Sequence, residues 1–175
     1  MSRGRLTIRR GEPSQARALH ALITANLEDG HLLPRMLEEL VVHAPRFAVA
    51  VRGKKIVGCA ELAPLSSQVA EVRSLAVDVK ERGTGVGTLL VDELRRRAHN
   101  EGFDKLCAFT HTPGYFSQMG FSIVPHLWLP EKIFTDCVKC PLFRRCGQYA
   151  MVAPLDGAAT VVDQPQPAAS VARFA

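Results

Sequence analysis

A glycine-rich stretch in the middle of the chain carries the clearest chemical signal in the sequence. It runs from Val77 to Leu90 (VDVKERGTGVGTLL), with Arg82, Gly85 and Gly87 between a strand-like and a helix-like run. The first amides of a helix lack partners within the helix, and the helix dipole is positive there, so such a turn can hold anionic oxygen. The stretch therefore predicts a pyrophosphate site, although a plain strand-to-helix turn would use the same glycines.

Two common phosphate-binding loops do not fit this stretch. A Walker loop ends in Gly-Lys-Ser/Thr, whereas Gly87 is followed directly by Thr88. A Rossmann turn follows the first strand of a parallel sheet, whereas this turn follows several strand-like segments in mid-chain.

Three cysteines near the end of the chain form a second candidate site. Cys137, Cys140 and Cys146 lie within ten residues, and such clustering in a cytosolic chain indicates metal or redox chemistry before a disulfide framework. A structural zinc site would need a fourth ligand, for which His111 and His126 are candidates. Free thiols, a regulatory disulfide and an iron–sulfur cluster are the alternatives.

The elements that must position these residues follow from hydrophobic periodicity. Alternation predicts a strand over Leu6 to Arg10, and helical spacing predicts two helices, opened near Pro13 and Pro34. Three further runs, over residues 46–52, 55–62 and 69–77, read as the strands of an antiparallel meander.

The second half of the chain begins with a helix. The period becomes helical from Val86, with Leu90, Val91, Leu94 and Ala98 on one stripe, and Gly102 closes the helix. The run 105–110 predicts a strand parallel to the third strand of the meander. A short helix over 115–119 and a last strand over 149–152 complete the elements.

Composition sets the broad class of the protein. The 175 residues suit one domain over 1–155, followed by an Ala/Pro/Gln-rich tail over 156–175 that we expect to be disordered. No apolar stretch approaches the roughly 20 residues that span a bilayer, and no signal peptide is evident, so we expect a cytoplasmic protein without membrane partners. The net charge is +5, but its basic residues are dispersed and only two Tyr and one Trp could stack on bases, so we expect no nucleic-acid partner. A homodimer stays open.

The glycine turn and the order of elements resemble the GNAT acetyltransferases. Their signature is Arg/Gln, two residues, Gly, one residue and Gly/Ala, which Arg82, Gly85 and Gly87 supply, and the resemblance covers about residues 5 to 153. It implies an α/β (α+β) GNAT fold with a mixed, mostly antiparallel twisted sheet of about six to seven strands and about four helices. It also implies acetyl-CoA as co-substrate. The implied contacts are Leu75, Ala76 and Val77 for the thioester and pantetheine, and Arg82, Gly83, Thr84, Gly85, Val86, Gly87 and Thr88 for the pyrophosphate.

The same resemblance implies roles for three further residues. Glu71 stands on the strand before the turn, where many relatives keep a catalytic glutamate that deprotonates the amine. Arg73, two residues on and on the same face, could hold a carboxylate of the acceptor, although a surface ion pair between the two is the alternative. Many relatives protonate the departing thiolate with a Tyr four residues before Gly-Phe; here that slot is Phe116, and Tyr115 is the candidate general acid.

A narrower resemblance concerns the acceptor. Glu-x-Arg-x-x-Ala-Val over 71–77, and Leu-Pro-Glu-Lys over 129–132, are similar to N-acetylglutamate synthases, including their short stand-alone forms in arginine biosynthesis. The resemblance implies transfer of the acetyl group to the α-amino group of an amino acid, with L-glutamate first, by direct attack in a ternary complex. It adds Lys132 as a second ligand for the acceptor's carboxylate. The alternative is that Lys132 is a solvated lysine in a loop.

Two rival functions stay open at this point. Within the same class, the acceptor could be another small amine or a protein N-terminus, neither of which requires Arg73 or Lys132. In a different class, the cysteine cluster could form a non-catalytic module that senses metal or redox state.

Overall fold

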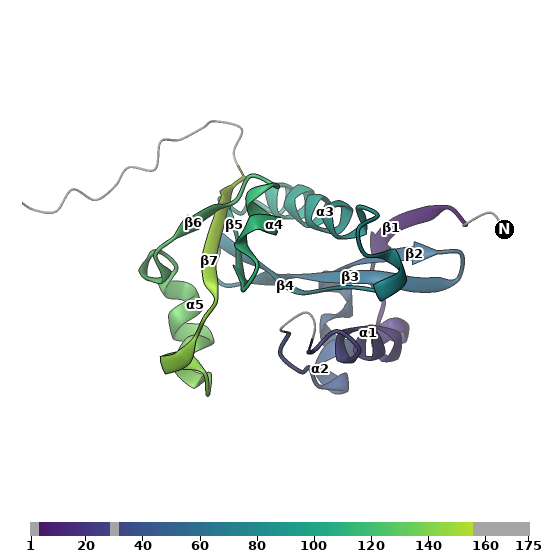
Figure 1. Cartoon of the computed structure of the whole chain (residues 1–175), viewed down its shortest axis with the longest axis horizontal. Coiled ribbons are helices and arrows are strands. Elements are labelled where there is room, and N and C mark those ends of the chain that lie inside the picture. The colour runs from purple at the N-terminus through teal and green to yellow at the C-terminus, as the bar shows by residue number, and fades with distance from the viewer. Residues whose placement is uncertain (1–3, 29–31, 156–175) are drawn as a thin grey trace, which may run out of the picture.

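A seven-stranded mixed sheet forms the centre of the protein in the computed structural model, which describes residues 4–28 and 32–155 (Figure 1). The strand order is β1-β2-β3-β4-β5-β7-β6, in which β4 and β5 are parallel and the other neighbours antiparallel. The strands are β1 (Leu6–Arg10), β2 (Phe47–Arg52), β3 (Lys55–Pro64), β4 (Val69–Val77), β5 (Lys105–Thr110), β6 (Ser122–Val124) and β7 (Tyr149–Pro154). The mixed, mostly antiparallel sheet predicted from the sequence is confirmed.

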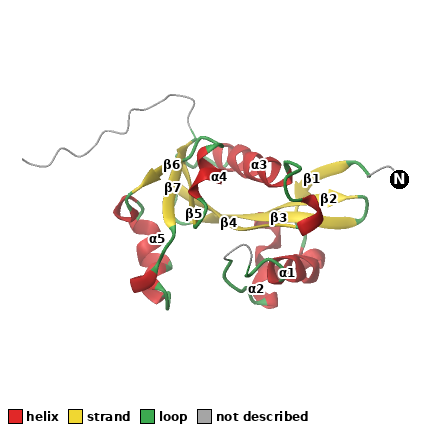
Figure 2. Ribbon diagram, viewed as in Figure 1, coloured by secondary structure: helices red, strands yellow, loops and turns green. Residues whose placement is uncertain are grey.

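Helices cover both faces of this sheet. Those described are α1 (Ala16–Thr24), α2 (Leu37–His43), α3 (Val86–Asn100), α4 (Pro113–Ser117) and α5 (Pro130–Thr135). Figures 1 and 2 show α3 and α4 on one side, and α1, α2 and α5 on the other. The two faces bury separate apolar clusters, one under α3 and one under α1 and α2.

Helix α3 lies close against the sheet because its apolar stripe meets a glycine. Its predicted stripe of Leu90, Val91, Leu94 and Ala98 is fully buried. A Cβ atom added at Gly58 of β3 would lie 2.9 Å from the Val86 side chain and 3.0 Å from that of Leu90. Gly58 therefore lets the first turn of α3 approach β3, which fixes the position of the glycine turn.

Several boundaries differ from the sequence prediction. Arg46 belongs to a 3-10 turn before β2, and α2 begins at Leu37 rather than near Pro34. The short helix α4 begins at Pro113, which fixes the first turn through its ring, and not at Tyr115. Strand β6 and helix α5 were not predicted, since they are only 3 and 6 residues long and show little periodicity.

Strand β4 changes its pairing partway along its length. It pairs with β5 at three positions, the last of which joins Glu71 to Cys107, and β4 then continues to Val77 without further pairing to β5. On its other side β4 pairs with β3 on both sides of a bulge, where Ser74 and Leu75 oppose Ala60. Beyond Glu71, β4 therefore separates from β5 while it remains part of the sheet.

Composition also leads to expectations about membrane spans and about the C-terminal tail. Within the described residues, no helix is long and apolar enough to cross a bilayer. The tail predicted over 156–175 lies outside the described residues.

Candidate active site

The glycine turn links β4 to α3 with two backbone conformations that favour glycine. Gly83 has φ +74° and Gly85, which caps α3, has φ +86°, a region that L-residues with side chains rarely adopt. The first bond within the helix runs from the Leu89 amide to the Gly85 carbonyl at 3.1 Å. The amides of the first turn therefore point out of the open end of α3, as an anion site requires.

Side chains on both sides anchor this turn. Glu81 accepts two hydrogen bonds from Arg52 of β2, at 2.9 and 3.0 Å, and Thr84 Oγ1 donates to the Glu81 carbonyl at 2.7 Å. Arg82 Nη2 donates to Asn26 Oδ1, just after α1, at 2.8 Å. Asn26 was not singled out from the sequence, where a single Asn after a helix carries no motif.

Tyr115 lies against the start of α3. A Cβ atom at Gly87 would collide with the Tyr115 hydroxyl, so the absence of a side chain at Gly87 makes room for it. Burial raises the pKa of Tyr115, although a hydrogen bond with the Thr88 side chain acts in the opposite direction. Phe116, in the slot where relatives have Tyr, is instead buried and packs edge-on against Phe121 at a centroid distance of 5.2 Å.

Glu71 sits in a network of four charged side chains. It accepts a hydrogen bond from Arg73 Nε at 2.6 Å and two from Lys132 Nζ at 2.8 and 2.9 Å. Asp136 accepts from the same Lys132 Nζ at 2.8 Å and also from Arg73 Nη2. The network joins β4 to α5, and its Glu71 side chain is only 5% exposed.

This network bears on two of the plainer interpretations. Glu71 and Arg73 do form an ion pair, in which the Glu71 side chain is buried and the Arg73 side chain is partly exposed. Lys132 lies on α5 and not in a loop; its ammonium is 5.2 Å from the centre of the Phe109 ring and its side chain is 14% exposed. The structure therefore brings together the three residues predicted as base and carboxylate ligands, and adds Asp136, which the sequence reading missed.

A second buried charge cluster lies on the same face of the sheet. Glu61 of β3 accepts from Arg35 Nη1 at 2.7 Å and lies 2.9 Å from His43 Nδ1, while Arg35 also donates to Ser74 Oγ at 2.8 Å and makes two bonds to Glu39. Burial lowers the pKa of Arg35, but its bonds and proximity to the two carboxylates outweigh burial and leave it raised. The signal in the sequence was a lone Glu61 inside an apolar strand, which needs a buried partner.

The cluster formed by Arg35, Glu39, His43, Glu61 and Ser74 fixes the bulge in β4. Ser74 has φ +49°, the one positive value among the described non-glycine residues. Arg35 binds its hydroxyl from the segment before α2. The backbone of Leu75 to Val77, expected to meet the thioester and pantetheine, is thus held from the α2 side.

The cysteine cluster gives no support to a zinc site. Among the described residues, no three His, Cys, Asp or Glu side chains gather in a way that could hold a metal ion, and all five cysteines are free thiols. Burial raises the pKa of Cys137, which disfavours the thiolate that binds metal. Metal binding by Cys137, Cys140 and Cys146 remains a prediction, and the arrangement of their side chains does not support it.

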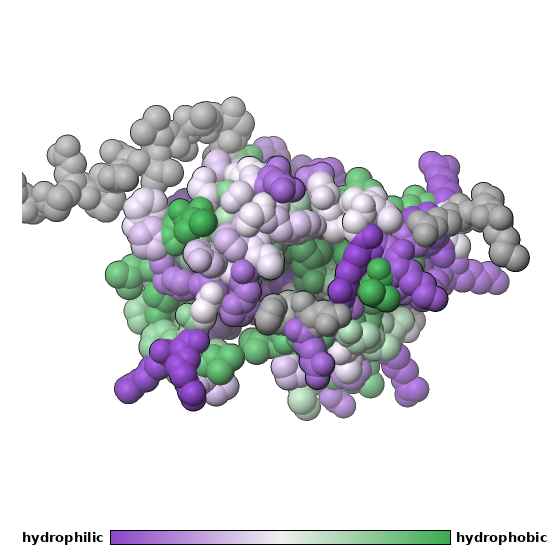
Figure 3. All heavy atoms as spheres, in the orientation of Figure 1, coloured by the Kyte–Doolittle hydropathy of each residue, from purple (hydrophilic) through white to green (hydrophobic). Residues whose placement is uncertain are grey.

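Hydrophobic side chains are exposed near the cysteine cluster. They gather at the left of the molecule in Figure 3, over the connection between β6 and α5. Exposed hydrophobic residues of this part of the chain include Leu127, at 81%, between β6 and α5, and Phe134, at 73%, on α5.

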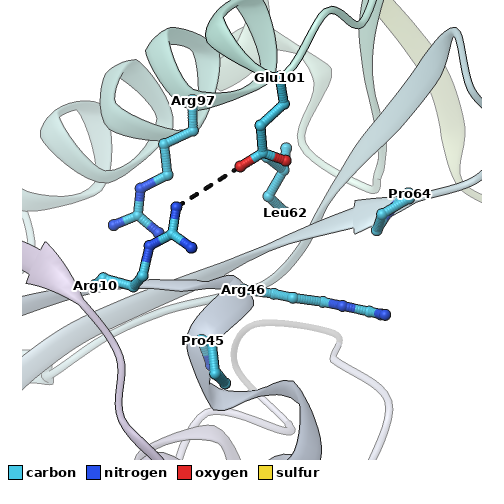
Figure 4. A pocket seen from close by; sticks show the side chains of 7 residues that line it. All are labelled: Arg10, Pro45, Arg46, Leu62, Pro64, Arg97 and Glu101. Atoms are coloured by element: carbon cyan, nitrogen blue, oxygen red, sulfur yellow. Dashed lines mark ion pairs between the residues drawn. The ribbon is translucent and has the colours of Figure 1, made fainter.

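A separate small cavity lies at the far end of α3. Figure 4 shows its lining, in which Arg10 and Glu101 form an ion pair at 3.7 Å and Arg97 comes from the last turn of the helix. Helix α3 has 15 residues, so at about 1.5 Å per residue roughly 20 Å separates this cavity from the glycine turn. It is not part of the site built by β4 and the start of α3.

Comparisons with known proteins agree with this geometry. The acetyltransferase (GNAT) family matches residues 16–121. An uncharacterized N-acetyltransferase of Chlorobaculum tepidum is 31% identical over 148 residues, which are 85% of this chain and 96% of that protein. An amino-acid acetyltransferase of Pasteurella multocida is 30% identical over 128 residues, 72% of this chain but 29% of that protein.

Solved structures show the same fold. The N-acetylglutamate synthase of Neisseria gonorrhoeae, complexed with coenzyme A and N-acetyl-glutamate, has a TM-score of 0.78 and 25% identity, over 89% of this chain and 36% of that one. A Mycobacterium tuberculosis protein solved with CoA has a TM-score of 0.72 and 23% identity, over 85% of this chain and 98% of that one. The chain thus spans about a third of the longer relatives that it matches. It belongs to the acetyltransferase (GNAT) family and is an acetyl-CoA-dependent N-acetyltransferase.

Proposed function

We propose that the chain acetylates the α-amino group of an amino acid, with L-glutamate as the first candidate. The observation that carries this proposal is that Glu71 lies between Arg73 and Lys132, at the position where β4 leaves β5. Such a group of side chains can bind both ends of an amino acid. The carboxylate of the protein can accept a proton from the amine, and the two cations can hold the carboxylate of the amino acid. The curated relatives named amino-acid acetyltransferases support the choice of acceptor.

The glycine turn and the β4 backbone beyond Glu71 are suited to bind acetyl-CoA. The open end of α3 and the glycines at 83, 85 and 87 offer backbone amides to a pyrophosphate. The β4 backbone beyond Glu71 is not paired to β5 and can bond to the amides of pantetheine. Acetyl-CoA supplies an acetyl thioester when it is bound there.

The reaction can then be assigned to side chains of this chain. Glu71 takes a proton from the acceptor's ammonium group, directly or through one water, and the neutral amine attacks the thioester carbonyl. The C–N bond forms, and the attacking nitrogen loses its second proton to water. The C–S bond then breaks, and Tyr115 donates its hydroxyl proton to the departing sulfur, after which Glu71 and Tyr115 return to their starting protonation states by exchange with solvent. Burial raises the pKa of Tyr115 above the ordinary tyrosine value of about 10, so its hydroxyl is protonated at neutral pH.

The choice of acceptor is tested by thiol release from acetyl-CoA with each of the twenty amino acids and with aliphatic amines that lack a carboxylate. We expect glutamate to give the highest kcat/KM, and Arg73→Ala to raise its KM because one carboxylate ligand is lost. Faster release with amines that lack a carboxylate would replace this proposal by acetylation of another small amine.

Substitution of Gly85 tests the placement of the pyrophosphate. Gly85→Val forces a branched side chain into φ +86° at the open end of α3, so we expect the Kd for coenzyme A to rise at least about tenfold, measured by calorimetry. Gly102→Val is the matched control, because Gly102 has φ +85° at the opposite end of the same helix. Equal coenzyme A affinity in wild type and Gly85→Val would move the pyrophosphate elsewhere.

Removal of the Glu71 charge tests the general base. In Glu71→Gln we expect kcat to fall by roughly 10²- to 10⁴-fold, while the Kd for coenzyme A changes little. Glu93→Gln is the control, since Glu93 also accepts bonds from two arginines but lies on α3. A Glu71→Gln variant that folds, as judged by its thermal melt, and keeps kcat would exclude Glu71 as the base.

Titration of Tyr115 tests the pKa of the proposed general acid. In a Tyr149→Phe variant, Tyr115 is the only tyrosine, and its phenolate absorbance should appear with a midpoint above the usual value of about 10. Because the folded-state pKa is raised, any proton donation by Tyr115 persists as pH rises and is lost only above that midpoint. Thr88→Val should raise the midpoint further, and a midpoint below 10 would contradict a pKa raised by burial.

A further inference from the structure

The two cations proposed to bind the acceptor already hold a carboxylate that belongs to the chain. Asp136 accepts from Lys132 Nζ at 2.8 Å and from Arg73 Nη2. These are the same two groups that would bind a carboxylate of the acceptor. An acceptor therefore meets these cations with one of their carboxylate positions filled.

The charges of the network balance without a ligand. Two carboxylates, Glu71 and Asp136, face two cations, Arg73 and Lys132, and three of the four side chains are less than 30% exposed. A third carboxylate would have to share these two cations with Glu71 and Asp136 in a poorly solvated site, which is unfavourable. The acceptor's carboxylate and Asp136 thus compete for the same donors.

Of the four side chains in the network, Asp136 is the one that can move away from the two cations. Glu71 and Arg73 lie on a central strand, and Lys132 lies within α5 with its side chain 14% exposed. Asp136 has the most exposed side chain of the four, at 35%, and follows the last residue of α5 with a non-helical backbone, φ −120° and ψ −48°. A change of its side-chain rotamer would release both cations without moving the sheet.

We infer that Asp136 is an internal substitute for the acceptor's carboxylate and a determinant of acceptor affinity. In the free protein it pairs with Arg73 and Lys132 and keeps these cations in place beside Glu71. When an amino acid binds, its carboxylate replaces that of Asp136. Breaking the contacts of Asp136 opposes binding and so weakens the affinity for the acceptor. This inference rests on the proposed function, since it needs an acceptor with a carboxylate.

The test is the acceptor KM of Asp136→Asn, which removes the charge and keeps the size of the side chain. We expect the KM for L-glutamate to fall about tenfold, because a competing charge-assisted hydrogen bond is weakened, with a smaller change in kcat. Asp136→Glu, which restores the charge, should return the KM toward the wild-type value. Asp104→Asn, an exposed carboxylate in the turn before β5, is the matched control and should leave the KM unchanged.

A binding measurement separates this inference from the proposed function. The single tryptophan, Trp128, lies two residues before α5, so its fluorescence in the presence of coenzyme A can follow the binding of L-glutamate directly. Tighter binding to Asp136→Asn than to wild type supports the exchange, even if the wild type acetylates a different carboxylate-bearing amine faster. Glutamate acetylation that depends on Arg73, together with an unchanged or higher KM in Asp136→Asn, would overturn the inference and leave the proposed function standing. No glutamate binding to either protein would overturn both.

Discussion

The site depends on the point at which β4 and β5 part. A strand within a sheet normally bonds to a neighbour on each side, which leaves no backbone group for a ligand. Here the pairing of β4 with β5 ends at Glu71, whereas its pairing with β3 continues to Val77. The same strand therefore supplies a carboxylate held rigidly by the sheet and, farther along, a backbone that can bond to an extended cofactor. The glycine turn follows at its end, so a single chain segment positions both the proposed base and the proposed cofactor site.

Burying a charge on β3 or β4 is unfavourable, and two polar clusters offset the loss of solvation. The Glu71 network lies toward α5, and the cluster around Glu61 lies toward α2. Each contains a nearly inaccessible carboxylate that accepts bonds from a cation, which is the condition under which ionised groups are tolerated in an interior. The two clusters thus tie the central strands to the α2 side through Arg35 and to α5 through Lys132.

The sequence predicted the elements well where periodicity is long, as in α3 and β4, whose bounds at Val86 and at Val69 and Val77 agree with the structure. It also placed Glu71, Arg73 and Lys132 in one site, although Lys132 is 61 residues from Glu71. It missed Asp136, because an aspartate after a short helix has no distinctive neighbours and its role comes from contacts across the fold. The Arg35 cluster was missed for the same reason: Arg35 stands in an irregular segment, and the partners of such a residue are set by tertiary packing.

The bulge at Ser74 also changes which side chains of β4 face which helix layer. Before it, Ala70 and Val72 point toward α3, while Glu71 and Arg73 point the other way; after it, Ala76 joins the α1 and α2 side, and Leu75 and Val77 pack toward α3. The extra residue at the bulge thus shifts the alternation of side chains between the two faces of the sheet by one position. A regular strand without the bulge would place Leu75 and Val77 on the face of Glu71, and Ala76 on the face of α3, with no change in the sequence. The bulge in this part of β4 therefore matters to the site as much as the identity of its side chains.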